Sequence, residues 1–348
     1  METKTNVEKQ KKKIFFFFKN KNKNNLLSKK LSTKRIKYDI FIDSTTKFSV
    51  IHDKIKNILI FNGNHPSKFI KEGNIYKYIN VSNIKKISNG NRHTLILTKD
   101  NNIYTFGSNI HGQCGLDNEK YPEINTPIKI NFSFLYDKNK IKDVICLFDS
   151  SCILLDSNEL YEFGGIKNNF IPQKIIINEI IDKILPSSQS DFLVFLTKTN
   201  KIYKKYKGDI IIHNIPLPKI DFNKIKDFFY YFYDTFILLE NNTIYHQEMM
   251  DDYNVQNKNP FNLSIGEHII KIIKNKYATI YLTTKWIIII GKNELYAVLK
   301  NKNKNIIDIV LSAKTAMILS KDGKVYEFGL GIDKEKISLS SLTTIYNS

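Results

Sequence analysis

The chain has 348 residues, a formal net charge of +19 at pH 7, 14 glycines and 3 cysteines. Its best apolar runs, at residues 14–18 and 286–290, are far shorter than the roughly 20 residues that span a bilayer, and the first is too short for a signal peptide. These features argue against a membrane span or secretion and predict an intracellular protein of the cytoplasm or nucleus.

The cysteine and histidine patterns argue against a metal site. Cys114, Cys146 and Cys152 are odd in number, and none shows the Cys-x-x-Cys spacing of a zinc site. We expect reduced thiols, with Cys114 buried. The seven histidines are scattered, and no nucleophile elbow or phosphate-binding glycine loop is found. The sequence therefore predicts no metal, no cofactor and no enzyme, and a monomer.

More than half of the positive charge lies near the amino terminus. Residues 1–37 hold 13 Lys or Arg against Glu2 and Glu8, which gives +11 of the total +19. With its KNKNKNN stretch this segment is predicted to be a disordered arm. A lysine-rich arm is typical of proteins that contact nucleic acid or acidic surfaces, but the chain is rich in Lys, Asn and Ile throughout, so base composition explains the lysines equally well. The candidate contacts are Lys11, Lys12, Lys13, Lys29, Lys30, Lys34 and Arg35.

One pattern recurs along the chain. A short apolar strand ends at a polar turn, which is followed by an aliphatic residue, Tyr, one further residue, Phe and Gly. The clearest copies are LTKDNNIYTFG (97–107), LLDSNELYEFG (154–164) and LSKDGKVYEFG (319–329). Because Asp and Asn bond to their own backbone and tolerate left-handed geometry, the polar stretch predicts a hairpin turn.

The spacing of the copies predicts their architecture. A leading strand precedes each clear copy, and segments 84–107, 141–164 and 306–329 each hold 24 residues. Weaker copies at 50–64, 195–206, 238–248 and 281–293 raise the number to seven. Taking the ends as Asn62, Gly107, Gly164, Tyr206, Glu248, Gly291 and Gly329, the spacings are 45, 57, 42, 42, 43 and 38. Such a period, made of short strands, is typical of propeller blades.

The side chains fit blades that pack between two neighbours. Strands such as LILT and CILLD are apolar on both faces. Three aromatic pairs share one face and should pack on an adjacent blade: Tyr104 with Phe106, Tyr161 with Phe163, and Tyr326 with Phe328. The Gly that follows each pair is expected where a side chain would crowd a neighbour or where φ is positive. The aromatic run 228–233 is assigned to blade core rather than to base stacking, and the proline-containing segments 126–130, 171–177 and 215–220 to outer strands.

The segment HTLILTKDNNIYTFGSNIHGQCG resembles a repeat of the regulator of chromosome condensation family, approximately G-x-x-H-T-x-x-L-T-x-D-G-x-V-Y-x-W-G-x-N-x-x-G-Q-L-G. Asn101, Phe106 and Cys114 depart from it. The matching residues are Gly90, His93, Thr94, Thr98, Asp100, Tyr104, Gly107, Asn109, Gly112, Gln113 and Gly115. The likeness is strong there, good around Gly164 and Gly329, and weak elsewhere.

The resemblance implies an all-β, seven-bladed β-propeller over residues 38–348, after the basic arm at 1–37. It implies structural, repeat-marking roles for His93, Tyr104, Gly107, Gly112, Gln113, Gly115, Tyr161, Gly164, Tyr326 and Gly329. For His93 we expect a structural hydrogen bond rather than catalysis.

Two functions follow from the same resemblance. Many members are protein-interaction modules, whereas the founding member is a guanine-nucleotide exchange factor for the small GTPase Ran and binds chromatin through a basic arm. We therefore expect a protein-binding platform that acts through its face loops; the alternative is an exchange factor for a Ran-like GTPase on chromatin. The glycine content, about 4% against an average of about 7%, departs from this glycine-rich family.

Two further expectations concern loops and ends. The long spacing between the second and third repeats predicts a partner-binding insertion or an ordinary long loop. The candidate residues are Asn131, Phe132, Phe134, Tyr136, Asp137 and Lys138. The carboxyl-terminal segment 336–346 is expected to pair with the first repeat and close the ring, because a circular array must cover its end edges.

Overall fold

The computed structural model describes most of the chain from residue 40 onward. The described residues are 40–44, 48–53, 58–63, 71–72, 75–78, 81–133, 140–165, 169–185, 192–199, 201–206, 209–211, 225–231, 234–247, 256–257, 267–275, 277–291, 295–301, 305–311, 315–329 and 343–347. The arm at 1–37, with all seven of its candidate basic residues, lies outside them.

The described strands form seven antiparallel sheets, numbered 1 to 7 here in chain order. Sheet 1 has five strands in the order β1-β2-β3-β5-β4, and each of sheets 2 to 7 has four strands in sequence order. Each sheet is therefore made from one continuous stretch of chain, as the repeat pattern predicts, and sheets 2 to 7 are simple meanders.

The strands at equivalent positions of the sheets are as follows. The first strands are β1 (Ile40–Ser44), β6 (Ile84–Asn89), β10 (Ile141–Cys146), β14 (Ile181–Leu185), β18 (Ile225–Tyr231), β22 (Ile269–Lys274) and β26 (Ile306–Leu311). The second strands are β2 (Phe48–Asp53), β7 (His93–Thr98), β11 (Ser150–Leu155), β15 (Phe192–Thr197), β19 (Asp234–Leu239), β23 (Ala278–Thr283) and β27 (Thr315–Ser320). The third strands are β3 (Ile58–Gly63), β8 (Ile103–Ser108), β12 (Leu160–Gly164), β16 (Ile202–Tyr206), β20 (Ile244–Gln247), β24 (Trp286–Gly291) and β28 (Lys324–Gly329). The outer strands are β4 (Lys71–Glu72), β5 (Ile75–Tyr78), β9 (Glu123–Ile130), β13 (Asn169–Ile175), β17 (Asp209–Ile211), β21 (Gln256–Asn257), β25 (Leu295–Lys300) and β29 (Thr343–Asn347).

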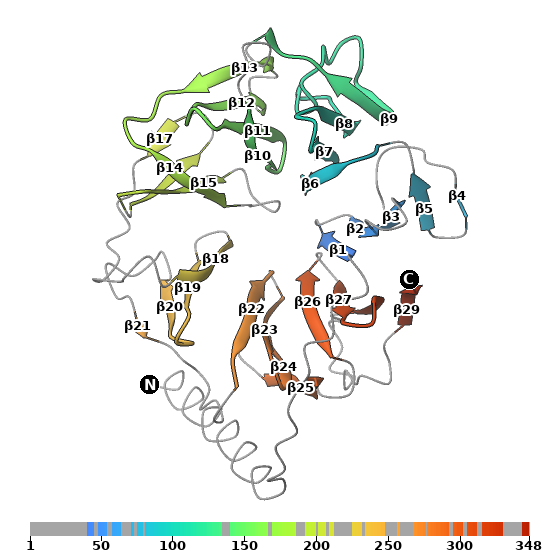
Figure 1. Ribbon diagram of the computed structural model, residues 1–348, viewed down its shortest axis with the longest axis vertical. Coiled ribbons are helices and arrows are strands. Elements are labelled where there is room, and N and C mark those ends of the chain that lie inside the picture. Colours follow the sequence, from blue (N-terminus) through green and yellow to red (C-terminus); the bar gives the residue numbers. More distant parts are fainter. Residues whose placement is uncertain are drawn as a thin grey trace, which may run out of the picture.

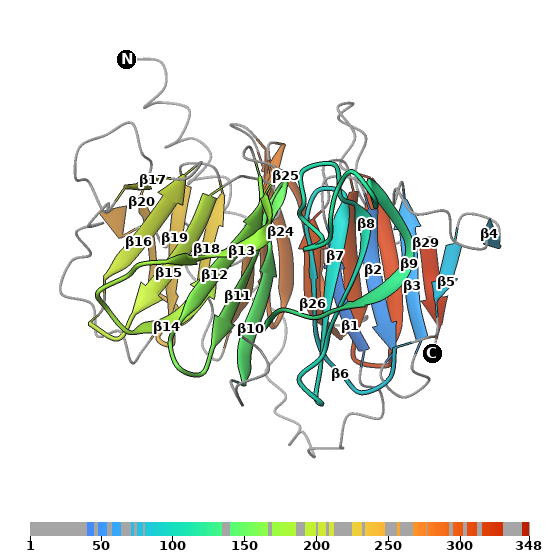
Figure 2. The same cartoon turned by 90° about the horizontal axis from the view of Figure 1, so that it is seen from above.

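The sheets are arranged around a common axis. Figure 1 shows the first strands nearest the axis and the outer strands at the rim. In the view turned by 90° the strands run between two faces of the ring (Figure 2). The chain is an all-β propeller.

The second strands show why the sheets stack side by side. Every residue of β7 is buried. Ile96 packs with Val50 of sheet 1, whereas Leu95 and Leu97 pack with Ile153 of sheet 3. Because successive side chains of a strand point to opposite faces, one apolar run supplies the core of two interfaces. The expectation of strands that are apolar on both faces is confirmed.

The third-strand aromatics also pack as expected, in each case against the preceding sheet. Phe106, with Tyr104 beside it, lies in the core between sheets 1 and 2. Phe163 and Tyr161 lie between sheets 2 and 3. Tyr326 and Phe328 contribute to the core between sheets 6 and 7. These pairs therefore act as structural residues of the repeat.

The two ends of the array meet through a shared apolar core. Ile51 and Ile60 of sheet 1 lie in one cluster with Val310, Met317 and Leu319 of sheet 7, and β1 contacts β26 and β27. The same kind of packing that joins neighbouring repeats therefore also joins the first to the last.

The expected pairing of the carboxyl-terminal segment with the first repeat is wrong. Within that segment the described strand β29 pairs with β28 of its own sheet, where Tyr346 faces Val325. Residues 336–342 lie outside the described part. A meander strand that returns to its own repeat has less loop entropy to overcome than one that crosses to a distant repeat, and the apolar core between sheets 1 and 7 makes the crossing unnecessary.

Two smaller expectations are tested by the strand register. Gly63 faces Phe48 as Gly107 faces His93, so the first repeat ends at Gly63 and not at Asn62. Pro127 and Pro172 lie in the outer strands β9 and β13, as predicted; residues 215–220 are outside the described part. The aromatic run 228–233 begins within β18, but its side chains are not described.

Candidate functional site

Antiparallel strands place successive connections on alternate faces of the ring, and the two faces are named here after one residue each. The Gln113 face carries the connections between first and second strands and between third and outer strands, including residues 90–92, 109–122 and 147–149. The Glu179 face carries the hairpin turns between second and third strands and the links to the next sheet, including 99–102, 131–140 and 176–180.

The extra length between the second and third repeats lies mainly on the Gln113 face. Residues 109–122 connect β8 to β9, whereas only 165–168 connect β12 to β13 in the next sheet. The link 131–140, which holds the candidate insertion residues, is shorter than the links 212–224 and 258–268. Most of the extra residues therefore lie in 109–122, and a partner-binding role of the link 131–140 stays a prediction.

Asn109 holds this connection in shape. Its Nδ2 donates to the carbonyl oxygens of Leu116, at 2.9 Å, and Tyr121, at 2.8 Å. Its Oδ1 accepts from the Cys114 N–H at 2.9 Å. Gln113 adds a bond from the His111 N–H to its Oε1, at 2.8 Å. The buried side-chain amide of Asn109 thus forms hydrogen bonds with three backbone groups. The connection therefore has a defined shape that does not depend on a partner.

Gly112 brings the connection against the next sheet. Its φ is +76°, and a Cβ there would lie 2.8 Å from the backbone nitrogen of Phe170 in β13. A side chain would be strained and would also push the connection away from sheet 3. Gly115 has a positive φ of 70°. The marker residues of this segment act by fixing the loop against its neighbour.

The outer part of the connection is exposed. Ile110 keeps 47% and Tyr121 keeps 37% of its surface accessible, and the Lys120 ammonium lies 5.4 Å from the centre of the Tyr121 ring. Asp117 and Glu119 are exposed nearby. The connection therefore presents apolar and charged side chains on a backbone that is held by buried bonds.

Of the six candidate residues of the 131–140 link, two are described. Asn131 is exposed, but Phe132 is buried in the core between sheets 2 and 3, with its ring centre 5.3 Å from that of Phe163. The proposed role of Phe132 in partner contact is wrong, because its ring fills the space that Gly115 leaves open. Phe134, Tyr136, Asp137 and Lys138 lie outside the described residues.

His93 joins sheets 2 and 3 beneath the Gln113 face. Its Nε2 lies 2.8 Å from the Ser151 Oγ, and this hydroxyl donates to the Gln113 carbonyl oxygen at 2.8 Å. Burial lowers the pKa of His93 from 6.5 to about 3, against a smaller opposing effect of the Ser150 backbone. The imidazole is therefore neutral near pH 7 and acts as a structural bridge, as expected.

The three cysteines are buried free thiols. Burial raises the pKa of Cys114 and of Cys152 well above the ordinary value, so both stay protonated near neutral pH. The Cys146 thiol donates to the Ser88 carbonyl oxygen at 3.0 Å. These thiols fill the core, in agreement with the expectation for Cys114.

On the Glu179 face, a set of hairpin asparagines links neighbouring sheets. Asn101, Asn158 and Asn242 have positive φ values of 65°, 72° and 67°. Each Oδ1 accepts from the first backbone N–H of the next sheet, at 2.7 Å from Ile141, 2.6 Å from Ile181 and 3.0 Å from Ile269. The repeat family that this chain resembles has Gly at this turn position. Asparagine keeps the left-handed turn conformation and adds a hydrogen bond between sheets. The repeated Asn was visible in the sequence, but its partner was not.

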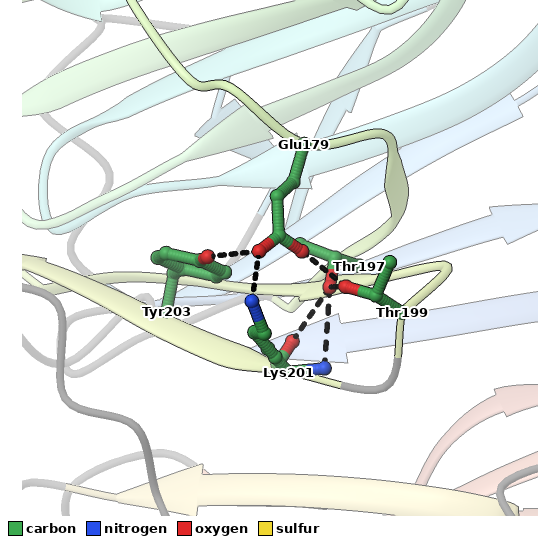
Figure 3. Close-up of polar contacts among 5 residues, drawn as sticks. All are labelled: Glu179, Thr197, Thr199, Lys201 and Tyr203. Carbon is green, nitrogen blue, oxygen red and sulfur yellow. Dashed lines mark hydrogen bonds and ion pairs between the residues drawn. The ribbon is translucent and has the colours of Figure 1, made fainter.

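Figure 3 shows a polar cluster on the same face, which the sequence did not reveal. The Glu179 carboxylate accepts from the Tyr203 hydroxyl at 2.6 Å, from the Lys201 ammonium and from the Thr199 hydroxyl. The Lys201 bond is the largest cause of the lowering of the Glu179 pKa to about 2. Glu179 therefore stays ionised near neutral pH and anchors the link between sheets 3 and 4.

A second glutamate repeats this arrangement. Glu267 precedes β22 as Glu179 precedes β14, by two residues, and its carboxylate accepts from the Thr283 hydroxyl at 2.8 Å. Thr283 and Thr197 hold equivalent register positions, since they face Ile269 and Ile181. The signal in the sequence is a Glu two residues before the first strand.

Among the described residues, no group of three His, Cys, Asp or Glu side chains is placed to hold a metal ion. In that same part of the chain, no helix has the length and apolar character needed to cross a bilayer.

Comparison with known families finds one repeat type. Two overlapping segments, residues 84–113 and 100–151, match the "Regulator of chromosome condensation (RCC1) repeat". They contain His93, Gly107 and Gln113, and they reach the beginning of sheet 3.

The similar curated proteins match over short stretches. The RCC1-like G exchanging factor-like protein of Mus musculus is 32% identical over 84 residues, which cover 23% of this chain and 17% of that protein. The protein RCC2 homolog of Xenopus laevis is 39% identical over 75 residues, which cover 22% of this chain and 14% of that protein. The matched part therefore spans less than a fifth of the length of these relatives.

The likeness to solved structures extends over nearly the whole chain. The crystal structure of Prp20p from Saccharomyces cerevisiae, described together with its binding to Gsp1p and histones, matches with a TM-score of 0.59 and 16% identity. The match covers 91% of this chain and 87% of that one. At this identity the likeness concerns the fold alone.

Proposed function

We propose that this chain, an RCC1-type repeat protein with an all-β propeller fold, is a protein-interaction platform that binds its partner through the loops of the Gln113 face. Propellers present variable loops on a rigid ring, an arrangement that suits recognition of a partner. The compartment, cytoplasm or nucleus, stays a prediction.

We infer further that each of the seven sheets is one blade. The support is the common register, in which Gly63, Gly107, Gly164, Gly291 and Gly329 hold the same position in their hairpins. The core shared by sheets 1 and 7 supports a closed ring.

The observation that carries the platform proposal is the connection 109–122. Its backbone is held by Asn109 and Gln113, whereas Ile110 and Tyr121 remain exposed. Aromatic and aliphatic side chains on a preorganised backbone bind with little loss of conformational entropy. Asp117 and Glu119 lie beside them, so a protein surface with an apolar centre and basic neighbours would be complementary.

The experiment is affinity capture of partners by the full chain, with Tyr121→Ala and Ile110→Glu as test variants. The matched control is Ile176→Glu on the Glu179 face, because Ile176 is more exposed, at 78%. We expect each test variant to lose at least about tenfold of the captured partner, corresponding to about 1.4 kcal/mol, and the control to retain it. Equal capture by all three variants would place the partner elsewhere.

Guanine-nucleotide exchange on a Ran-like GTPase is the alternative function. Its support is a relative named for exchange and a fold neighbour described with Gsp1p. The test is release of labelled GDP from a Ran-like GTPase at micromolar concentrations of the full chain. Acceleration that Tyr121→Ala abolishes would assign exchange to the Gln113 face, and an unchanged release rate would reject it.

Contact of the basic arm with chromatin, nucleic acid or another acidic surface also stays a prediction. It rests on the +11 charge of residues 1–37. Deleting these residues should weaken DNA binding and reduce its dependence on salt, because fewer counterions are released. The same DNA affinity with and without the arm would support base composition as the origin of the lysines.

A further inference from the structure

The first strands of sheets 2 to 7 share one irregularity at their start. In β6, Ile84 faces Thr98 and Lys86 faces Leu97, so Lys85 is left over. The same shift separates the first and third residues of β10, β14, β18, β22 and β26. Such a β-bulge leaves one extra residue unpaired and turns the chain locally. The strand at the axis can therefore show two consecutive polar residues, as Lys85 and Lys86 do between the buried Ile84 and Ile87.

The third residue of these strands alternates in charge around the axis. In chain order the position holds Lys86, Asp143, Lys183, Asp227, Lys271 and Asp308. In sheet 1 the equivalent position is Phe41, which faces His52 as Lys86 faces Leu97. Positive and negative residues cannot alternate around a ring of seven positions without placing two like charges side by side. The uncharged Phe41 occupies the position where this would occur.

Two of these positions form the same contact in widely separated parts of the chain. The Lys86 ammonium pairs with the Asp143 carboxylate between sheets 2 and 3. The Lys271 ammonium lies 2.8 Å from the Asp308 carboxylate between sheets 6 and 7. In both cases the Asp Oδ1 also accepts from the N–H of the following residue, Val144 or Ile309, at 2.8 Å.

These ion pairs are partly buried, so their electrostatic interaction is stronger than that of a fully exposed pair. The four side chains keep between 24% and 35% of their surface exposed, so solvent screens them less than it screens charges on the outside of the ring. An unlike charge on the adjacent strand is attractive there, and a like charge is repulsive.

We propose that this alternation is a charge register that sets the order of the sheets around the axis. A sheet with Lys at the third position favours neighbours with Asp, and a sheet with Asp favours neighbours with Lys. Repeats of similar shape can exchange places or pair between copies of the chain. The register disfavours such arrangements, because skipping one sheet brings two like charges together. The six charges also cancel, so this ring is neutral in a protein of net charge +19.

The test exchanges one pair in the full chain and measures the melting temperature at low salt. The single variant Lys86→Asp should lower it by about 2–4 °C for the like-charged contact with Asp143. The double variant Lys86→Asp/Asp143→Lys restores that contact but places a lysine beside Lys183 of sheet 4. The register predicts that this exchange recovers only part of the loss, and that adding Lys183→Gln recovers the rest while bringing no gain to the wild type.

A second series uses neutral variants, which fold even if like charges prevent folding. Asp143 has a lysine on each side in the register, Lys86 and Lys183, whereas the two register positions beside Lys86 hold Asp143 and the uncharged Phe41. Asp143→Asn, which keeps the Oδ1 acceptor, should therefore lower the melting temperature more than Lys86→Gln, and 1 M NaCl should reduce both differences. Full recovery by the exchange alone, or equal effects of the two neutral variants, would show isolated ion pairs and overturn the register.

Discussion

The imidazole of His93 in sheet 2 donates a hydrogen bond to the hydroxyl of Ser151 in sheet 3, with Nε2 and Oγ 2.8 Å apart. Because the serine proton is already directed to the Gln113 carbonyl, the hydrogen between the two residues must come from Nε2. Both side chains are completely buried. A residue that marks the repeat thus connects two sheets and supports the loop that we propose as the binding site.

The first prediction concerns pH. The pKa of His93 in the folded protein, about 3, lies below its ordinary value of 6.5. The unfolded chain therefore takes up a proton that the folded protein does not, and stability that is complete above pH 6.5 is lost as the pH falls towards 3. Between pH 6 and 5, which lies above the pKa range of most carboxylates, His93 alone should lower the unfolding free energy by about 1.4 kcal/mol per pH unit.

Urea unfolding of wild type and His93→Gln checks this. The variant should be less stable at pH 7.5, and its unfolding free energy should depend less steeply on pH. Parallel slopes would contradict the assignment.

The second prediction compares two glycines at the same register position. Gly107 has a φ of +107°, and a Cβ there would lie 2.4 Å from the Arg92 carbonyl oxygen. At Gly329 no atom of the described residues lies within 4 Å of the Cβ position. Gly107→Ala should cost at least about 2 kcal/mol through strain and overlap with backbone. Gly329→Ala, the matched control, should change stability by less than about 0.5 kcal/mol. Chemical denaturation measures both, and a neutral Gly107→Ala would disprove the steric argument. The expectation that the Gly after Phe is required sterically is confirmed at Gly107 and wrong at Gly329.

The third prediction concerns the bond between the Asn101 turn and the next sheet. Asn101→Gly keeps the positive φ of 65° but removes the acceptor for the Ile141 N–H. Leaving this partly buried donor without its partner should cost about 1–3 kcal/mol. Asn101→Asp keeps an acceptor oxygen and serves as the control, with an expected change below about 0.5 kcal/mol. Urea unfolding distinguishes the two; similar stability of both variants would mean that water replaces the bond.

The fourth prediction concerns the donors around Glu179. The Lys201 bond is the largest cause of the low pKa of Glu179, and the Tyr203 bond a smaller one. Lys201→Gln should therefore raise this pKa from about 2 towards 4.5 more than Tyr203→Phe does, as followed by NMR of the carboxyl carbon. The matched control is Lys174→Gln, which should raise the pKa of Glu159, the partner of Lys174, and leave that of Glu179 in place. An unchanged pKa of Glu179 in the Lys201→Gln variant would refute the contact between Glu179 and Lys201.

Local patterns predicted the repeat well. The hairpins and the aromatic pairs on third strands follow from residue spacing and from side-chain alternation, which are properties of a few neighbouring residues. The structural role of His93 was implied by the resemblance to the repeat family. The weaker copies were placed correctly as well, except for a shift of one residue at Gly63.

The residues of the candidate site were predicted less well from local patterns. Phe132 was a candidate for partner contact because it lies in the long spacing between the second and third repeats. Its ring instead packs on Phe163 from the next sheet and fills the space left by Gly115. The role of Glu179 was not predicted, because its hydrogen-bond donors lie 20 to 24 residues away in the chain. Contacts between sheets depend on the stacking of whole repeats, which spacing within one repeat does not contain.

The amino-acid sequence by itself determined the repeating unit, its strands and the apolar character of both sheet faces, because each depends on local periodicity and turn chemistry. Only the tertiary structure decided how the ring closes, which loop is held by Asn109 and exposed to a partner, and which charges meet at the axis. Those features arise where distant repeats pack together, so the partners Lys271 and Asp308, 37 residues apart, become neighbours only after the sheets have stacked.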